Sequence, residues 1–226
     1  MFTHVMPISF MGGTGGNFIR SLLISAKVGY TNLWDMSSHG NSHWGPMEIY
    51  NDTFNKVPND LSCQVADVIN AIERSSLTYD PKDCFYQNMH IIDLPELMKY
   101  FSKSIRVTYN FEDVIDVSMA MVAKNGDDGK VDLNDIYHIK KNYIGRKMIM
   151  IKHLRDFQPI EDLKDRVLFI SWQELLNKDG HKLFADLSNF TGIPEYSFSH
   201  DNLALWRTKT NKTVQSFKQR LGHFFR

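Results

Sequence analysis

Between a short apolar stretch and an amphipathic one, the chain carries Gly12-Gly13-Thr14-Gly15-Gly16-Asn17. Residues 4–11 are largely apolar and end at these glycines, which predicts a short buried strand. Beyond them apolar side chains recur at helical spacing: Phe18, Ile19, Leu22, Leu23 and Ala26. Strand, glycine turn and helix in this order favour an anion-binding loop, because glycines leave backbone N–H groups uncovered and a helix start adds further free N–H groups.

We expect this loop to bind a phosphate group. Thr14 and Asn17 can add side-chain donors, and Arg20, one turn into the helix, can add charge if it points toward the loop. Walker A would need Gly-Lys-Ser/Thr where Gly16-Asn17-Phe18 stands, and the dinucleotide fingerprint would need a glycine at Phe18. The alternative is a tight structural turn between strand and helix.

The rest of the chain alternates between apolar runs and helical patterns. We predict further strands at 83–90, 105–109 and 166–171. We predict helices from Pro95 through Phe101, over 114–121, about 133–157, 172–176 and 180–191. Alternation of this kind predicts an α/β fold, a three-layer α/β/α arrangement around a central parallel sheet. Ligands of such sheets bind outside the carboxyl ends of the strands, where the glycine loop, His90, Tyr109-Asn110 and Ser171-Trp172 would meet.

Length and charge limit the classes of protein. The 226 residues fit a single domain, 1–226, and the 26 lysines and arginines balance 26 aspartates and glutamates. No overall field therefore attracts nucleic acid or a membrane, so any anion site must be local. We expect no signal peptide, no membrane-spanning segment and a cytoplasmic protein. Cys63 and Cys84 fit buried thiols better than a disulfide.

Two segments break the regular pattern. Residues 28–59 form an irregular excursion that includes His39 and His43; since no third ligand is evident, we expect no metal, and an acceptor pocket or simple loop packing remain open. A basic-aromatic tail spans about 207–226 and ends in a short amphipathic helix. That helix would pack on the domain or on a second subunit of a homodimer, a weak anionic-surface contact is a further alternative, and no stable membrane insertion is expected.

The chain resembles the sulfotransferases that use 3′-phosphoadenosine-5′-phosphosulfate (PAPS). Their first strand ends in a Pro-Lys-Ser-Gly-Thr-Thr-Trp type loop, with which Thr14, Gly15, Asn17 and Phe18 agree, whereas Gly13 stands at the family's lysine. Asn88-Met89-His90-Ile91-Ile92, with Pro95 close behind, is similar to the Lys-Thr-His-Leu-Pro segment that carries the catalytic histidine.

Three later stretches extend the resemblance. Asn110 and Ser118 match polar positions of the 3′-phosphate site, where Tyr109 replaces the family's arginine. The segments 167–176 and 183–194 resemble the family's "strand, Tyr-Glu-Asp-Leu, helix, Phe-Leu-Gly-Ile-Pro" run. Trp206-Arg207-Thr208-Lys209 is a loose counterpart of the Arg-Lys-Gly loop that closes on the nucleotide.

The resemblance implies a P-loop-like nucleotide-binding topology and a sulfotransferase with PAPS as donor, a small molecule or glycan as acceptor and no metal. His90 would be the base, and Arg20 or a distant lysine would replace the missing loop lysine. The implied donor-binding residues are Gly12, Gly13, Thr14, Gly15, Gly16, Asn17, Phe18, Asn110, Ser118, Arg207 and Lys209. Arg207, Lys209 and Lys212 fit a solvated tail equally well, and Arg106 fits a solvated edge strand. The alternatives are a nucleotide-dependent kinase or glycosyltransferase, and a nonenzymatic nucleotide-binding protein of the same fold.

Overall fold

The computed structural model describes residues 1, 3, 5–11, 13–28, 85–89, 94–123, 133–152 and 159–224. The strands are β1 (Val5–Ser9), β2 (Phe85–Met89), β3 (Ser104–Thr108) and β4 (Val167–Ser171). The helices are α1 (Gly16–Val28), α5 (Leu94–Leu97), α6 (Val114–Ala123), α7 (Leu133–Lys152), α8 (Trp172–Asn177), α9 (Gly180–Thr191) and α10 (His200–Phe224). Short 3₁₀ turns are η1 (Phe111–Asp113), η3 (Glu161–Leu163) and η4 (Glu195–Ser197). The predictions for residues 29–59 and for Cys63 and Cys84 lie outside the described residues.

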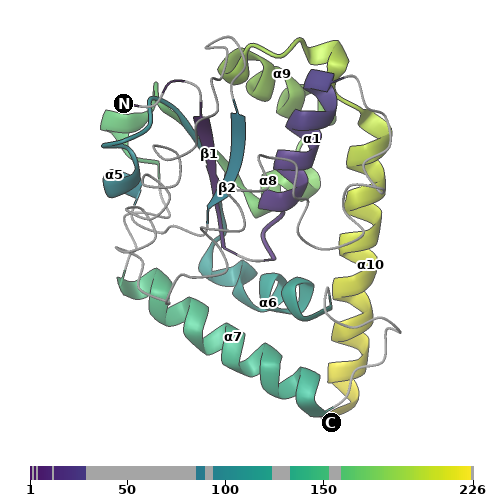
Figure 1. Cartoon of the computed structure of the whole chain (residues 1–226). Coiled ribbons are helices and arrows are strands. Elements are labelled where there is room, and N and C mark those ends of the chain that lie inside the picture. The colour runs from purple at the N-terminus through teal and green to yellow at the C-terminus, as the bar shows by residue number, and fades with distance from the viewer. Residues whose placement is uncertain are drawn as a thin grey trace.

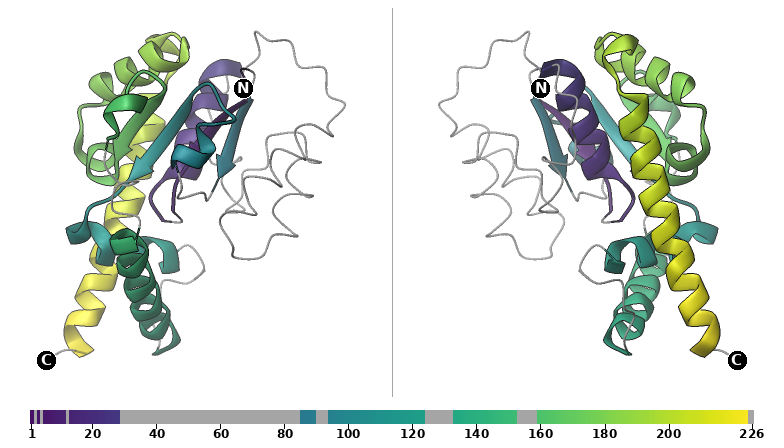
Figure 2. Two further views of the ribbon diagram at one scale, coloured as in Figure 1. Left: turned by 90° about the vertical axis from the view of Figure 1, so that its left-hand side faces the viewer. Right: turned by 90° about the vertical axis from the view of Figure 1, so that its right-hand side faces the viewer.

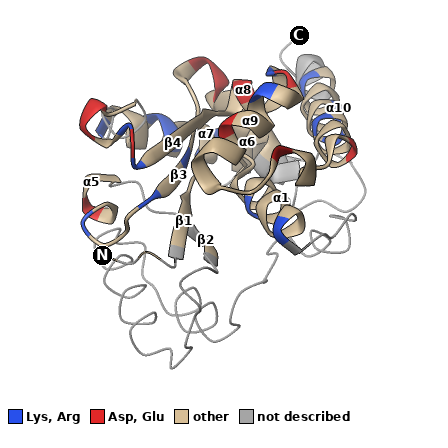
Figure 3. Cartoon of the chain, turned by 90° about the horizontal axis from the view of Figure 1, so that it is seen from above, with Lys and Arg blue, Asp and Glu red and all other residues tan. Residues whose placement is uncertain are grey.

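The four strands form one parallel sheet in the order β2-β1-β3-β4, which confirms the predicted α/β class (Figure 3). The chain leaves β1 toward β2 on one side, whereas β3 and β4 lie on the other. Connections that diverge in this way create a switch point, and the crevice between the carboxyl ends of β1 and β3 is where ligands of open α/β sheets bind.

The main core lies on one side of the sheet. Alternate residues of β1, β3 and β4 point into it, and Ile8, Ile105 and Leu168 lie level with one another across the sheet. Helices α1 and α9 supply the facing side chains, which include Ile19, Leu23, Phe184 and Leu187. Seen from above, α5 lies on the opposite side of the sheet from α1 and α9 (Figure 3), so helices flank both faces.

Pro7 stands inside β1, although proline has no N–H to donate to a central strand. The structure accommodates it because the β1–β3 ladder begins only at Ile8, which pairs with Ile105. The hydroxyl of Ser104 then donates to the Pro7 carbonyl at 3.0 Å. The proline therefore shortens one ladder without removing β1 from the centre of the sheet.

Helices α6 and α7 lie beyond the carboxyl ends of the strands, and α10 runs along the whole height of the molecule to reach them (Figures 1 and 2). Buried Met119, Ile139, Val214 and Phe217 join these three helices. A second cluster joins the end of β3 to α6, α7 and α8 through Tyr109, Val117, Met150 and Trp172. No helix in the described ranges has the length and apolar character needed to cross a membrane.

Two predicted helix limits are wrong. The helix starting near Pro95 ends at Leu97 and does not continue to Phe101. The segment 207–226 is not a separate tail, because α10 runs unbroken from His200 to Phe224. No glycine or proline interrupts 200–221, and Leu203, Val214 and Phe217 on one side of the helix are buried.

Replacing Gly16 by alanine should destabilise the protein. A Cβ there would lie 2.1 Å from the ring of Phe10, whereas a Cβ at Gly145 meets nothing within 4 Å. We expect Gly16→Ala to lower the free energy of unfolding by about 1–3 kcal/mol in urea denaturation. Gly145→Ala, the control in a helix interior, should raise it by up to about 1 kcal/mol; equal effects of the two changes would contradict the packing seen here.

Candidate functional site

The glycine loop forms a closed turn. The Met11 carbonyl accepts the Thr14 N–H at 3.2 Å and the Thr14 hydroxyl at 2.7 Å, and Thr14 is fully buried. Gly13 and Gly15 have φ values of 86° and 87°, which side chains other than glycine rarely adopt. Thr14 therefore stabilises the turn, and the backbone at Gly13 and Gly15 depends on glycine. Gly12 lies outside the described residues.

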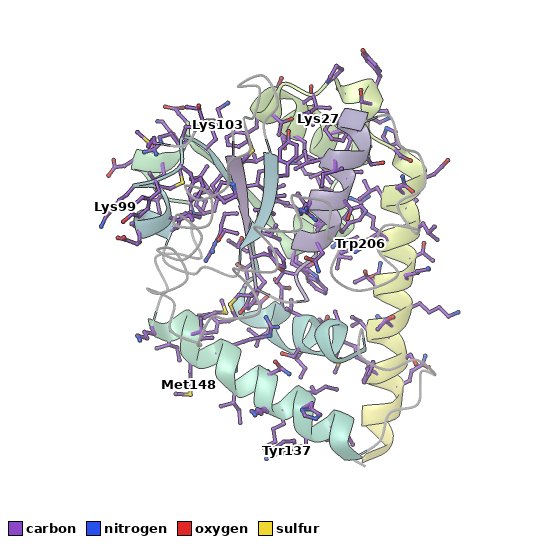
Figure 4. All side chains as sticks on the ribbon, in the orientation of Figure 1. Lys27, Lys99, Lys103, Tyr137, Met148 and Trp206 are labelled. Atoms are coloured by element: carbon purple, nitrogen blue, oxygen red, sulfur yellow. The ribbon has the colours of Figure 1, made fainter. Side chains whose placement is uncertain are left out.

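The end of the loop packs closely against other elements. A Cβ at Gly15 would lie 2.6 Å from Leu175 and 2.8 Å from Trp206. Phe18 stacks on Trp206 with ring centroids 4.8 Å apart (Trp206 is labelled in Figure 4). Packing within a tight structural turn therefore explains why Gly15 and Phe18 stand at these positions. Half-buried Asn17 and the start of α1 lie at the carboxyl edge of the sheet.

Arg106 lies under this edge and is not solvated. The expectation of an exposed edge position is wrong, because β3 lies between β1 and β4 and Arg106 is only 1% exposed. Its Nη1 donates to the hydroxyl of Ser9, the last residue of β1. One guanidinium therefore joins the middle of β3 to the last residue of β1, the two strands that form the switch point.

A second buried guanidinium reaches the same place from α7. The Cζ of Arg146, a residue only 3% exposed, lies 5.8 Å from the centroid of the Tyr109 ring. Burial raises the pKa of Tyr109, and the positive charges of Arg146 and Arg106 oppose that shift. Burial lowers the pKa of Arg146, and the Tyr109 phenol opposes that shift. Two positive charges thus lie around one phenol at the end of β3.

Arg146 was missed by sequence reasoning, although the pattern contains a signal. It lies on the inward stripe of α7 with Ile139, Tyr143 and Met150, at successive intervals of four, three and four residues. An arginine in an apolar helical stripe is buried, and buried arginines are uncommon. Its position beside Tyr109 puts a guanidinium at the end of β3.

Other predicted residues have contacts inside the fold. The Nε of Arg20 donates to the Tyr86 carbonyl at 2.8 Å, so this bond points toward β2 and not toward the loop. The Ser118 hydroxyl donates to the Val114 carbonyl at 2.6 Å and is fully buried. Asn110 is exposed beside Tyr109, and its backbone N–H donates to Asp113 at 2.9 Å.

Arg207 donates hydrogen bonds to backbone carbonyls at the end of α8. Its Nε donates to the Leu175 carbonyl at 2.9 Å and its Nη2 to the Lys178 carbonyl at 2.6 Å. Burial lowers the pKa of Arg207, and Asp179 opposes that shift. Arg207 and exposed Lys209 both belong to α10, so the expected loop around Trp206–Lys209 is helical.

His90, the predicted base, lies outside the described residues and follows directly after β2 in the chain. His39 and His43 also lie outside them. Among the side chains that the structure describes, no three His, Cys, Asp or Glu residues gather as a metal site would require.

Comparison with known proteins identifies no relative: no protein-family model, no curated protein and no solved structure matches this chain. The fold and the site geometry therefore carry the functional argument.

Replacing Arg207 should reduce the stability of the protein, because its hydrogen bonds to the end of α8 would be lost. Hydrogen bonds from charged groups contribute about 1.5–3 kcal/mol each, so we expect Arg207→Gln to lower the free energy of unfolding by about 2 kcal/mol. Exposed Lys212 on the same helix is the control, and Lys212→Gln should change it by less than about 0.5 kcal/mol. Chemical denaturation measures both; unchanged stability of Arg207→Gln would refute the structural role.

Proposed function

We propose that this chain is a sulfotransferase-like protein that binds PAPS at the switch point between β1 and β3 and transfers the sulfuryl group to a hydroxyl or amine. The observation that carries the proposal is the presence of a glycine turn and two buried guanidiniums, Arg106 and Arg146, at one edge of the sheet. A P-loop-like topology, with the glycine turn following an inner strand flanked on both sides, is part of the same proposal.

The electrostatics of this edge suit a phosphorylated nucleotide. The chain has no net charge, so a dianion must be held by local positive groups. The first backbone N–H groups of α1 and its dipole would face the phosphosulfate. Arg106 and Arg146 would supply the charge that the family places in the loop lysine and in the arginine at the Tyr109 position.

The proposed transfer needs positioning more than covalent assistance. His90 takes the proton of the acceptor hydroxyl, and the acceptor oxygen attacks sulfur in line with the bond to the 5′-phosphate. The new S–O bond forms as the bond to the phosphate breaks, and adenosine 3′,5′-bisphosphate leaves. The guanidiniums stabilise the negative charge that develops on that phosphate.

A nonenzymatic nucleotide-binding protein is the second candidate. Its support is that Thr14, Ser118 and Arg207 all make hydrogen bonds within the fold, so a large part of the expected donor site has structural contacts. The chain also lacks the loop lysine, since Gly13 takes its place. A kinase or glycosyltransferase is disfavoured by the missing Gly-Lys-Ser/Thr sequence.

Thermal unfolding with added nucleotides tests the proposed binding. We expect adenosine 3′,5′-bisphosphate at a hundredfold excess over its Kd to stabilise the fold by about 2.7 kcal/mol, which raises Tm by about 5 °C or more, while ATP and a sugar nucleotide give smaller shifts. Arg146→Met should remove most of this shift, measured from the variant's own Tm without nucleotide, because loss of the contact with Tyr109 lowers that Tm. Its neighbour Lys147 provides the control Lys147→Met, which should keep the shift.

The absence of a shift with the bisphosphate in the unmodified protein would reject the sulfotransferase proposal. A full shift in Arg146→Met would instead show that Arg146 does not bind the nucleotide. The proposed site would then consist of the glycine turn and Arg106 alone.

His90→Ala should abolish sulfuryl transfer and preserve the bisphosphate shift, since a base contacts the acceptor and not the nucleotide. Transfer of labelled sulfuryl groups from PAPS to a panel of hydroxyl and amine acceptors measures the first effect, and thermal unfolding measures the second. Turnover that persists in His90→Ala would reject this role. Nucleotide binding without turnover of any acceptor would favour the nonenzymatic protein.

A further inference from the structure

Helix α7 exposes large apolar side chains on its outer side. Tyr137, Ile144, Met148 and Ile151 are 61%, 47%, 66% and 69% exposed, respectively. Tyr137 and Met148 point away from the body of the protein on the same side of the helix (Figure 4). We refer to these four residues as the outer stripe.

The outer stripe is a second apolar face and not the edge of the first. Its members are separated by seven, four and three residues, so at 3.6 residues per turn they lie on one side of the helix. The opposite side carries Ile139, Tyr143 and Met150, which pack in the clusters with α6, α8 and α10. The fold needs that inner side to close its core and leaves the outer stripe at the end of the molecule, beyond the strands (Figures 1 and 2).

Lysines border the outer stripe on both sides. On a helical projection Lys140 and Lys147 lie along one edge, and Lys141 and Lys152 lie along the other. No aspartate or glutamate occurs between residues 136 and 152. The surface is therefore an apolar stripe between two rows of positive charge, although the chain as a whole is neutral.

We propose that the outer stripe docks on a membrane surface that contains anionic lipid. Helices with an apolar face and lysines at its borders lie in the plane of the interface, the apolar side chains entering the acyl boundary and the ammonium groups extending to the headgroups. The binding is peripheral and reversible, and it is independent of the sulfotransferase-like proposal because it uses the side of α7 opposite Arg146.

The charge around the outer stripe favours an anionic membrane over a second copy of the chain as its partner. Since lysines line both edges, any twofold pairing of the stripe with itself places lysine opposite lysine, and the stripe supplies no carboxylate to compensate. Phosphatidylserine headgroups offer the complementary negative charge.

Vesicle co-sedimentation with the full chain tests the proposal. We expect binding to phosphatidylcholine vesicles that contain phosphatidylserine, little binding to pure phosphatidylcholine vesicles, and weaker binding at high salt. The double variant Ile144→Ser/Met148→Ser should reduce the partition coefficient by about tenfold or more. Lys141→Gln/Lys152→Gln should reduce it roughly fivefold per lysine.

Matched changes elsewhere provide the controls. Tyr196, 90% exposed in η4, gives Tyr196→Ser, and exposed Lys182 in α9 gives Lys182→Gln; neither should alter vesicle binding. Far-UV circular dichroism and Tm establish that the variants fold, which exposed positions should permit. The proposal fails if anionic vesicles do not bind the chain, or if the control changes reduce binding as much as the stripe changes. It also fails if light scattering shows a dimer that Ile144→Ser/Met148→Ser dissociates.

Discussion

The backbone of Gly15 and Gly16 lies close to side chains from distant parts of the chain, and much of the structure depends on that approach. Phe10, which directly follows β1, Leu175 from α8 and Trp206 from α10 occupy the space where two Cβ atoms would stand. Trp206 also stacks on Phe18, which ties the last helix to the first. From this contact α10 continues to α6 and α7, which close the carboxyl edge of the sheet. The glycines therefore serve packing as much as any ligand.

Two buried guanidinium groups lie at the carboxyl edge of the sheet, where apolar side chains surround them. Burying a guanidinium costs free energy that an aliphatic side chain of similar size would not. The chain nevertheless buries both Arg106 and Arg146 near Tyr109, at the place where an open parallel sheet binds its ligands. Residues whose pKa is shifted by burial and by specific charges are more frequent at functional sites than elsewhere. These arginines consequently support the proposed anion site more strongly than the loop does.

Helix α7 connects the two proposals because it presents different chemistry on opposite sides. Its inner side delivers Arg146 to the end of β3 and packs Ile139 against α6 and α10. Its outer side carries exposed apolar residues bordered by lysines. A membrane bound to that outer side would lie on the end of the molecule nearest the candidate site (Figure 2).

Local patterns were sufficient for the elements that depend on neighbours in the chain. The periodicity of α1, the apolar run of β4 and the span of α9 up to Gly192, whose φ is 79°, follow from short-range sterics, capping and hydrophobic spacing. Local patterns did not predict the strand order or the burial of Arg106. They also did not predict the hydrogen bond of Arg20 to β2 or the hydrogen bonds of Arg207 at the end of α8. Each depends on residues distant in sequence, such as Ser9 and Arg106, whose numbers differ by 97. Only the folded chain brings such partners together, because hydrogen-bond and charge energies depend on distances that local sequence does not determine.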